Sequence, residues 1–362
     1  MKKTRRHAAI IGGGNMGADV ALTFAAGGWQ AHVVELSEAT RKKLPDYYAK
    51  GLKQVGSNAP LDRFTTHASL EDVPWRDIEI VIECIPEKLE LKKTLFKDLE
   101  RLARRDTTLA SNSSSFPIGA IGKGLKTQDR MLGLHYFLPA HLVPLVEVVR
   151  SKKTKEGLPE QVGELMRALG KVPVQVKKDI PGFLANRMQH ALSREAFALL
   201  DAGIATAEDI DAAVRFGFGF RFLAAGPCLQ RDHAGIEVHT AAAATMYPDL
   251  SNTDKPAKAL RSRRDRGDLG MKTGKGFFEW DAESIKREKA RSLDPDSDLG
   301  DQLVTTEVGR LKTEDIDIAL DAGLVRAQDY LNRGLIAGAC LMLRGESRVI
   351  GAPLATLEGG KP

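Results

Sequence analysis

The sequence predicts an α/β protein in which an N-terminal doubly wound parallel sheet is followed by a mostly α-helical C-terminal domain. Between residues 7 and 36, an apolar run, a glycine turn, a helical stretch and a second apolar run follow one another, as in a parallel sheet. Further strand-like runs lie at residues 78–84, 107–111, 131–137, 145–149 and 171–176. After Lys178 the strand pattern stops and helical periodicity replaces it.

The turn after the first predicted strand reads Gly12-Gly13-Gly14-Asn15-Met16-Gly17, with the spacing of a Rossmann-type dinucleotide-binding loop. Gly12 permits the tight turn, Gly14 lets a pyrophosphate approach the backbone, and Gly17 lets the helix pack closely on the strand. Asn15 and Met16 begin a helix whose free N–H groups would face the phosphates. The alternative is a plain strand-to-helix turn, but the strand on either side favours a nucleotide site.

Glu35 ends the second predicted strand, where a carboxylate can accept hydrogen bonds from the adenosine ribose hydroxyls. The same charge repels a 2′-phosphate, so the sequence predicts NAD as the cofactor rather than NADP. Arg41, Lys42 and Lys43 lie nearby, and we expect them on a solvated helix face.

The 362 residues predict two domains and an appendage. Asp179-Ile180-Pro181 predicts a helix start, and that helix would continue to about Asp201. A second helix start is predicted at Thr206-Ala207-Glu208-Asp209. We therefore expect an NAD-binding Rossmann domain at residues 1–178, a helical domain at 179–290 and a C-terminal extension of unknown role at 291–362.

Composition excludes several classes of partner. The formal net charge is +5, but 53 basic residues are mixed with 48 acidic ones and aromatics make up only 6%, which disfavours nucleic acid. No apolar run reaches the length of a membrane span, and the basic start leads into a strand rather than a signal peptide, so we expect the cytoplasm. Cys84, Cys228 and Cys340 are far apart, so we expect no metal site and no catalytic thiol.

Polar residues that could carry chemistry follow two of the predicted strands. Asn112-Ser113-Ser114-Ser115 comes at the carboxyl end of one strand, where ligands of such sheets bind, although a serine-rich helix cap is the alternative. His135 and Glu147 lie on strands joined by a connector at residues 139–144 that could fold the chain back. A buried carboxylate behind an imidazole holds a general base in one tautomer, although a structural histidine is the alternative.

The chain resembles the L-3-hydroxyacyl-CoA dehydrogenase family over about residues 8–280. The matching stretches occur in the family's order: Gly12 to Gly17, Glu83-Cys84-Ile85-Pro86-Glu87-Lys88-Leu89 with Lys92, Ser111 to Ser115, Gly133-Leu134-His135-Tyr136-Phe137, Leu145-Val146-Glu147-Val148-Val149, Pro181-Gly182-Phe183-Leu184-Ala185-Asn186-Arg187 and Gly270-Met271-Lys272-Thr273-Gly274-Lys275-Gly276-Phe277-Phe278.

The resemblance implies a role for each residue that matches a family position. It implies His135 as the catalytic base, Glu147 as its partner, and Ser114 and Asn186 as further active-site residues. Glu87 and Lys92 match positions close to the cofactor. The resemblance also implies NAD-dependent oxidation of the 3-hydroxyl of a 3-hydroxyacyl-CoA, a place in fatty acid metabolism, and a homodimer built through the helical substrate domain.

Two departures from the family pattern leave the substrate open. Leu138 stands before Pro139, where the family usually has asparagine near the cofactor and the thioester. Residues 37–61 match the family's CoA-contacting region poorly, with Lys50 and Lys53 as possible substitutes, and Arg261-Ser262-Arg263-Arg264-Asp265-Arg266 is expected on a solvated helix face. The alternatives are a dehydrogenase of a CoA-free 3-hydroxy acid, of the gulonate or carnitine type, and a catalytically inactive NAD-binding protein.

Overall fold

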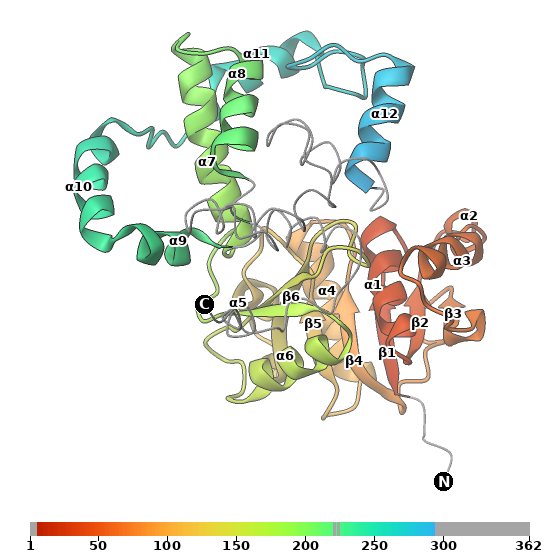
Figure 1. Cartoon of the computed structure of the whole chain (residues 1–362). Coiled ribbons are helices and arrows are strands. Elements are labelled where there is room, and N and C mark those ends of the chain that lie inside the picture. The colour runs from red at the N-terminus through yellow and green to blue at the C-terminus, as the bar shows by residue number, and fades with distance from the viewer. Residues whose placement is uncertain (1–5, 220–221, 223–224, 294–362) are drawn as a thin grey trace, which may run out of the picture. The chain divides into compact units, whose positions relative to one another are not determined.

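The computed structural model describes residues 6–219, 222 and 225–293 (Figure 1). Most of the extension expected at 291–362, with Cys340, lies outside these residues. The chain divides into two compact units, the first ending at Gln189 and the second beginning at His190. The predicted domain limits at 178/179 and 290/291 stay predictions.

The first unit is built on one eight-stranded sheet with the order β3-β2-β1-β4-β5-β6-β7-β8. All neighbouring strands run parallel except β6 and β7, which are antiparallel. The strands are β1 (His7–Ile11), β2 (Gln30–Val34), β3 (Phe64–His67), β4 (Ile78–Glu83), β5 (Thr108–Ser111), β6 (Met131–Tyr136), β7 (Leu145–Val149) and β8 (Val172–Val176). The predicted fold class is confirmed, although β3 was missed because its sequence, Phe-Thr-Thr-His, lacks an apolar run.

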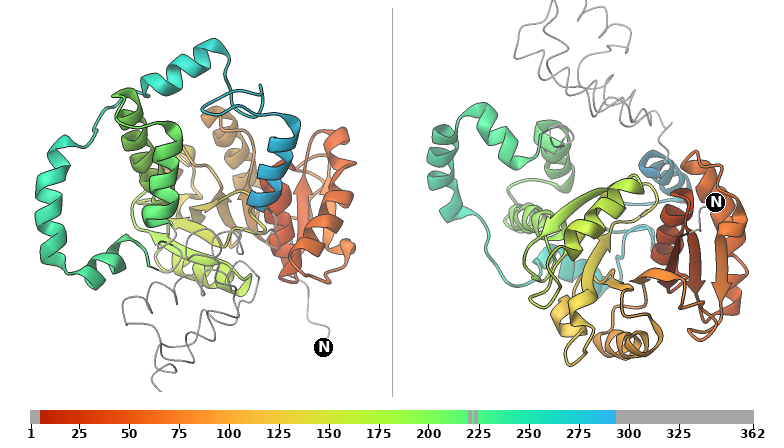
Figure 2. Two further views of the ribbon diagram at one scale, coloured as in Figure 1. Left: turned by 45° about the horizontal axis from the view of Figure 1, so that its top comes forward. Right: turned by 90° about the horizontal axis from the view of Figure 1, so that it is seen from below.

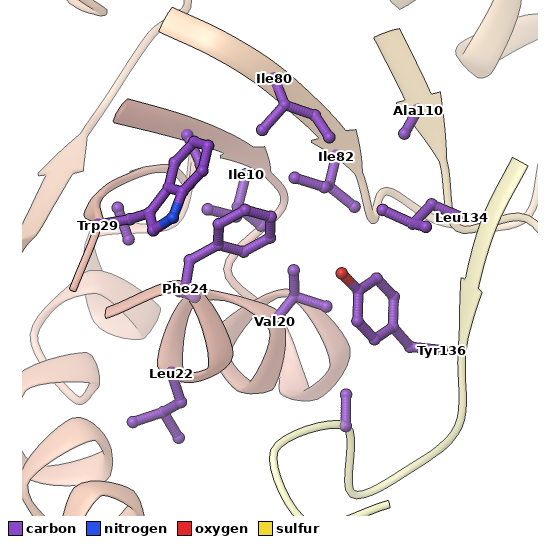
Figure 3. Close-up of a cluster of buried hydrophobic side chains, with 14 of the residues drawn as sticks. Ile10, Val20, Leu22, Phe24, Trp29, Ile80, Ile82, Ala110, Leu134 and Tyr136 are labelled. Atoms are coloured by element: carbon purple, nitrogen blue, oxygen red, sulfur yellow. The ribbon is translucent and has the colours of Figure 1, made fainter. Parts of the chain in front are cut away.

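Helices cover both faces of the sheet (Figure 1). Alternate strand residues such as Ile10 and Ile82 pack with Phe24 of α1 in one buried cluster (Figure 3). Residues of α3 and α6 also belong to this cluster. The residues between them, such as Ile11 and Val81, pack against α4 and α5 on the other face. The helices of this unit are α1 (Asn15–Ala26), α2 (Glu38–Arg41), α3 (Leu44–Gln54), α4 (Leu89–Leu102), α5 (Ile118–Ile121) and α6 (Leu158–Ala168), with short 3₁₀ turns η1 (Leu61–Arg63) and η2 (Gln128–Arg130).

The predicted helix start at Asp179-Ile180-Pro181 is wrong in its position. The helix α7 (Ala185–Asp201) begins four residues after Pro181 and ends where expected. Asp179 instead accepts hydrogen bonds from the backbone N–H groups of Ile118 at 3.0 Å and Gly119 at 2.8 Å, at the start of α5. A local sequence pattern cannot distinguish a cap of its own helix from a cap of a distant one.

Among the residues that the structure describes, the second unit is mostly helical, as predicted. Its helices after α7 are α8 (Ala207–Ala212), the π-helical turn η3 (Ala213–Phe218), α9 (Pro227–Ala234), α10 (Ile236–Met246), η5 (Tyr247–Asp249), α11 (Lys258–Arg266) and α12 (Ala282–Leu293). Thr206 caps α8 as predicted, since its side chain accepts from Asp209 N. The consecutive helices α9 and α10 meet at a bend at Gly235, which has a positive φ of 94° (Figure 2).

Few apolar side chains are buried in the described part of the second unit. From His190 on, only Ala225 and Ala259 are buried among the described apolar residues. Large apolar side chains such as Ile204, Ile236 and Met246 are more than half exposed, at 69%, 57% and 54%. None of the described helices is long and apolar enough to cross a bilayer.

A row of three histidines crosses the first three strands of the sheet. His7 Nδ1 lies 3.0 Å from His32 Nε2, and His32 Nδ1 lies 3.0 Å from His67 Nε2. Each neutral ring can donate from one nitrogen to the next ring in the row. Burial and the neighbouring His67 and His7 lower the pKa of His32 to about 4, and Asp77 opposes this shift.

Acid should therefore weaken the fold through His32. Unfolded His32 would bind a proton near its ordinary pKa of 6.5, whereas the folded residue binds it near 4. The free energy of unfolding therefore decreases as the pH is lowered from 6.5 to 4. We expect wild type to lose about 2 kcal/mol from this residue between pH 7 and pH 5. Urea unfolding at both pH values measures it, and His32→Leu should flatten the slope. Equal slopes for the two proteins would refute the assignment.

Candidate active site

The glycine turn has the geometry that a dinucleotide requires. Gly12 has a φ of 105°, and a Cβ there would lie 2.7 Å from the Cys84 carbonyl oxygen. A Cβ on Gly17 would lie 1.8 Å from the Gly12 carbonyl oxygen, so only glycine allows α1 to pack this closely on β1. Above Gly14, at the N-cap of α1, no atom lies within 4 Å of the Cβ position. Asn15 and Met16 form the first turn beside this open backbone, which fits a pyrophosphate.

Glu35 lies beside that turn. Its Oε2 accepts the Gly13 N–H at 2.9 Å and its Oε1 accepts the Ser37 N–H at 2.8 Å. Each carboxylate oxygen keeps acceptor capacity for a ribose hydroxyl. Arg41 uses one guanidinium nitrogen on the carbonyls of Glu35 and Leu36, at 2.6 and 2.8 Å, and so ties α2 to this position. The glycine turn and Glu35 together fit NAD.

His135 and Glu147 face each other across the antiparallel pair β6 and β7. The strand register places the two residues opposite one another, and His135 Nδ1 lies 2.7 Å from Glu147 Oε2. Glu147 is fully buried and the His135 side chain is 6% exposed. The interpretation that the connector folds the chain back and joins the two side chains is therefore correct.

Glu147 is held as a carboxylate. Burial alone would raise its pKa, but hydrogen bonds from His135 and from the Ala185 and Leu184 N–H groups outweigh burial and lower it. Both amides, at 2.9 Å, donate to Oε1 at the start of α7. Because a carboxylate only accepts, the proton of neutral His135 is on Nδ1 and the lone pair is on Nε2.

Two aromatic rings flank the imidazole. Phe137 lies edge-on to His135 with ring centroids 4.6 Å apart, and Phe183 lies tilted at 5.4 Å. Phe183 is 1% exposed and has a φ of 47°, which is unusual for a residue with a side chain. Sequence reasoning matched both residues to the family motif but assigned them no part in the site.

The serine loop and α7 bring two further polar side chains to the same region of the first unit. Asn112 Oδ1 accepts the Tyr136 N–H at 2.8 Å, which ties the loop of Ser114 to the residue after His135. Asn186 is the second residue of α7, directly after the amides that bind Glu147. Within the described part of the chain, neither the Ser114 hydroxyl nor the Asn186 amide has a protein hydrogen-bond partner.

A closed ring of polar contacts joins the ends of β4 and β5. Lys92 Nζ, 1% exposed, lies 2.6 Å from Glu83 Oε1 and 3.1 Å from Glu87 Oε2. Ser111 Oγ donates to Glu83 at 2.5 Å, and Ser113 Oγ donates to Glu87 at 2.6 Å. The Ser113 N–H closes the ring on Ser111 Oγ at 3.1 Å. Sequence reasoning found Glu87 and Lys92 but missed the roles of Glu83 and Ser111.

Family models match most of the chain. Residues 7–180 match the NAD binding domain of 3-hydroxyacyl-CoA dehydrogenase, and residues 182–280 match the C-terminal domain of the same enzyme. A third model, described as AbpE bacteria, matches residues 279–349, most of which lie outside the described residues.

Individual relatives agree with these models but differ in substrate. A 3-hydroxybutyryl-CoA dehydrogenase of Clostridioides difficile is 32% identical over 285 residues, covering 75% of this chain and 98% of the relative. A 5-formyl-3-hydroxy-2-methylpyridine 4-carboxylate 5-dehydrogenase of Mesorhizobium japonicum is 31% identical over 296 residues, covering 80% and 96%. A solved structure of a 5-dehydrogenase for this pyridine acid, an NAD⁺-dependent dismutase, aligns with a TM-score of 0.74 and 29% identity, covering 85% of this chain and all of that one.

Removing the Lys92 contacts should lower the free energy of unfolding far more than removing a surface ion pair on the same helix. Lys92→Met leaves the buried Glu83 carboxylate without its counter-charge, and we expect a loss of about 3–5 kcal/mol in the free energy of unfolding. Lys93→Met is the matched control, because its exposed pair with Glu90 should contribute less than about 1 kcal/mol. Urea unfolding measures the free energy of unfolding of both variants. Similar decreases would show that the ring of polar contacts around Lys92 does not stabilise the fold.

Proposed function

The chain belongs to the 3-hydroxyacyl-CoA dehydrogenase family, and from that premise we propose that it oxidises the 3-hydroxyl of a 3-hydroxyacyl-CoA with His135 as general base. It is an NAD-dependent oxidoreductase of that type. The contact between His135 Nδ1 and the ionised Glu147 carries the proposal, because it leaves Nε2 as a proton acceptor.

In the proposed reaction, each site residue either moves a proton, stabilises a charge or binds the substrate oxygen. NAD, when bound, accepts the hydrogen that leaves the carbinol carbon with its electron pair. His135 Nε2 takes the proton from the hydroxyl, and the Glu147 carboxylate stabilises the imidazolium that forms. Ser114 and Asn186 would hydrogen-bond the substrate oxygen. Their side-chain polar groups have no hydrogen-bond partner among the residues that the structure describes. In the reverse direction His135 returns the proton to the forming alcohol.

A CoA-free substrate is the second candidate, and Leu138 is the observation that favours it. Leu138 is 57% exposed three residues after His135 and offers an apolar surface in place of an amide. The Mesorhizobium relative is named for a pyridine carboxylate rather than a thioester. For a CoA thioester, exposed Lys50 and Lys53 on α3 are our candidates for a phosphate contact. Arg263, Arg264 and Arg266 contact Phe277, Asp265 and Asp268 locally.

We also propose that the protein works as a homodimer in the cytoplasm, in fatty acid metabolism if the thioester is its substrate. The apolar side chains exposed on the second unit support association, since single domains rarely leave this much apolar surface in water. Light scattering after size-exclusion chromatography would give the mass of the particle.

His135→Ala should abolish proton transfer without disturbing the nucleotide site. We expect kcat to fall by about 10²- to 10⁴-fold. The NADH dissociation constant should stay nearly unchanged, because the glycine turn follows β1 whereas His135 is on β6. Steady-state kinetics and NADH fluorescence titration measure the two quantities. Turnover at the wild-type rate would end the assignment of His135 as base.

One assay separates the substrate classes. NADH formation is followed by absorbance with 3-hydroxybutyryl-CoA, with gulonate and carnitine, and with the pyridine aldehyde that the Mesorhizobium relative is named for. We expect turnover of the thioester, and we expect Lys50→Ala/Lys53→Ala to raise its KM by about tenfold per lost phosphate contact. Turnover of only a CoA-free compound would refute the thioester and support the CoA-free substrate. Tight NAD binding without any turnover would indicate an inactive NAD-binding protein.

A further inference from the structure

The connector between β6 and β7, residues 137–144, is fastened to α1 by a buried carboxylate that the proposed reaction does not use. Asp19 lies in the second turn of α1 and is 1% exposed. Its Oδ2 accepts the Ala140 N–H at 2.8 Å, and its Oδ1 accepts the hydroxyl of Tyr47 of α3. His141 Nδ1 lies 2.9 Å from Oδ1, without the alignment of a hydrogen bond.

Other groups hold the same stretch from further elements. Lys171, 7% exposed and directly before β8, donates its ammonium to the carbonyls of Ala140 at 2.5 Å and Val143 at 3.0 Å. Burial lowers the pKa of Lys171 to about 8, while Asp19 opposes that shift. His141 Nε2 lies 3.1 Å from the Gln54 side-chain oxygen on α3. The backbone of Ala140 is thus bound through both its N–H and its C=O.

Holding a connector with buried charges carries a large desolvation free energy. Desolvating a carboxylate and an ammonium costs several kcal/mol for each, and apolar residues of the same size would often stabilise a fold as well. Polar contacts differ from apolar packing because they are directional and fix one position of the backbone. The connector here joins the strand of His135 to the strand of Glu147, and Ala140 lies only five residues beyond His135.

We propose that Asp19, with His141 and Lys171, is a positioning device that sets the His135–Glu147 hairpin against the helix whose N-terminus receives the NAD pyrophosphate. The inference rests on the proposed function in taking His135 as the base. The start of α1 would hold the pyrophosphate of NAD, and the base is on β6, so the distance from bound NAD to the base would depend on what joins α1 to the β6–β7 hairpin. Misplacement by about 1 Å can cost about 10²-fold in rate.

Asp19→Asn tests the device, with Thr107→Val as a matched control. Thr107 is fully buried in the same unit and donates to the Ile78 carbonyl at 2.8 Å, at the opposite end of the strands from the site. We expect Asp19→Asn to lower kcat by about 10- to 100-fold while KM and the NAD dissociation constant change less than about threefold. Thr107→Val should lower the melting temperature comparably but leave kcat near wild type. Equal effects of both variants on kcat would overturn the proposal.

Hydrogen exchange measured by mass spectrometry needs no substrate and separates this inference from the proposed function. In the full chain with NAD, amides of residues 137–144 should exchange about tenfold faster in Asp19→Asn than in wild type or Thr107→Val. If no substrate is turned over, the proposed function fails, and the exchange comparison still decides whether Asp19 holds the connector. Unchanged exchange of that segment in Asp19→Asn would overturn the inference.

Discussion

The site depends on one buried carboxylate, that of Glu147. Its two oxygens bind different parts of the first unit: one accepts from the imidazole of His135, and the other accepts from the two amides at the start of α7. A carboxylate this deeply buried is stable only because all of these donors are present. The same donors keep it ionised, so they also determine which nitrogen of His135 is free for chemistry.

Around this contact, polar side chains, several of them buried, form hydrogen bonds and ion pairs where the sheet ends and helices begin. The ring of Glu83, Lys92 and Glu87 fixes the ends of β4 and β5, and Glu35 fixes the glycine turn to the end of β2. Asp19 fixes the hairpin to α1. The apolar core between strands and helices can supply most of the stability, but it does not fix loop positions to fractions of an ångström. The directional contacts do so, and they gather at the carboxyl edge where ligands of such sheets bind.

The sequence was informative wherever a local pattern has a single physical cause. The glycine spacing predicted the turn at Gly12, and apolar runs predicted seven of the eight strands. The pairing of His135 with Glu147 was also predictable, because a short connector between two strands favours an antiparallel return. The polar strand β3 gave no signal. The distant partners of Asp19, Asp179 and Glu83 were not predictable either, because each of these carboxylates has a partner 28 or more positions away.

The state of the His135 ring tests the central claim most directly. In protein with ¹⁵N-labelled histidine, the ring nitrogen shifts and couplings assign the tautomer of each neutral imidazole. We expect His135 to carry its proton on Nδ1 in the wild-type protein at a pH where the ring is neutral, and to lose this preference in Glu147→Gln. A neutral His135 with its proton on Nε2 in the wild type would contradict the account, because that ring could not accept a proton there.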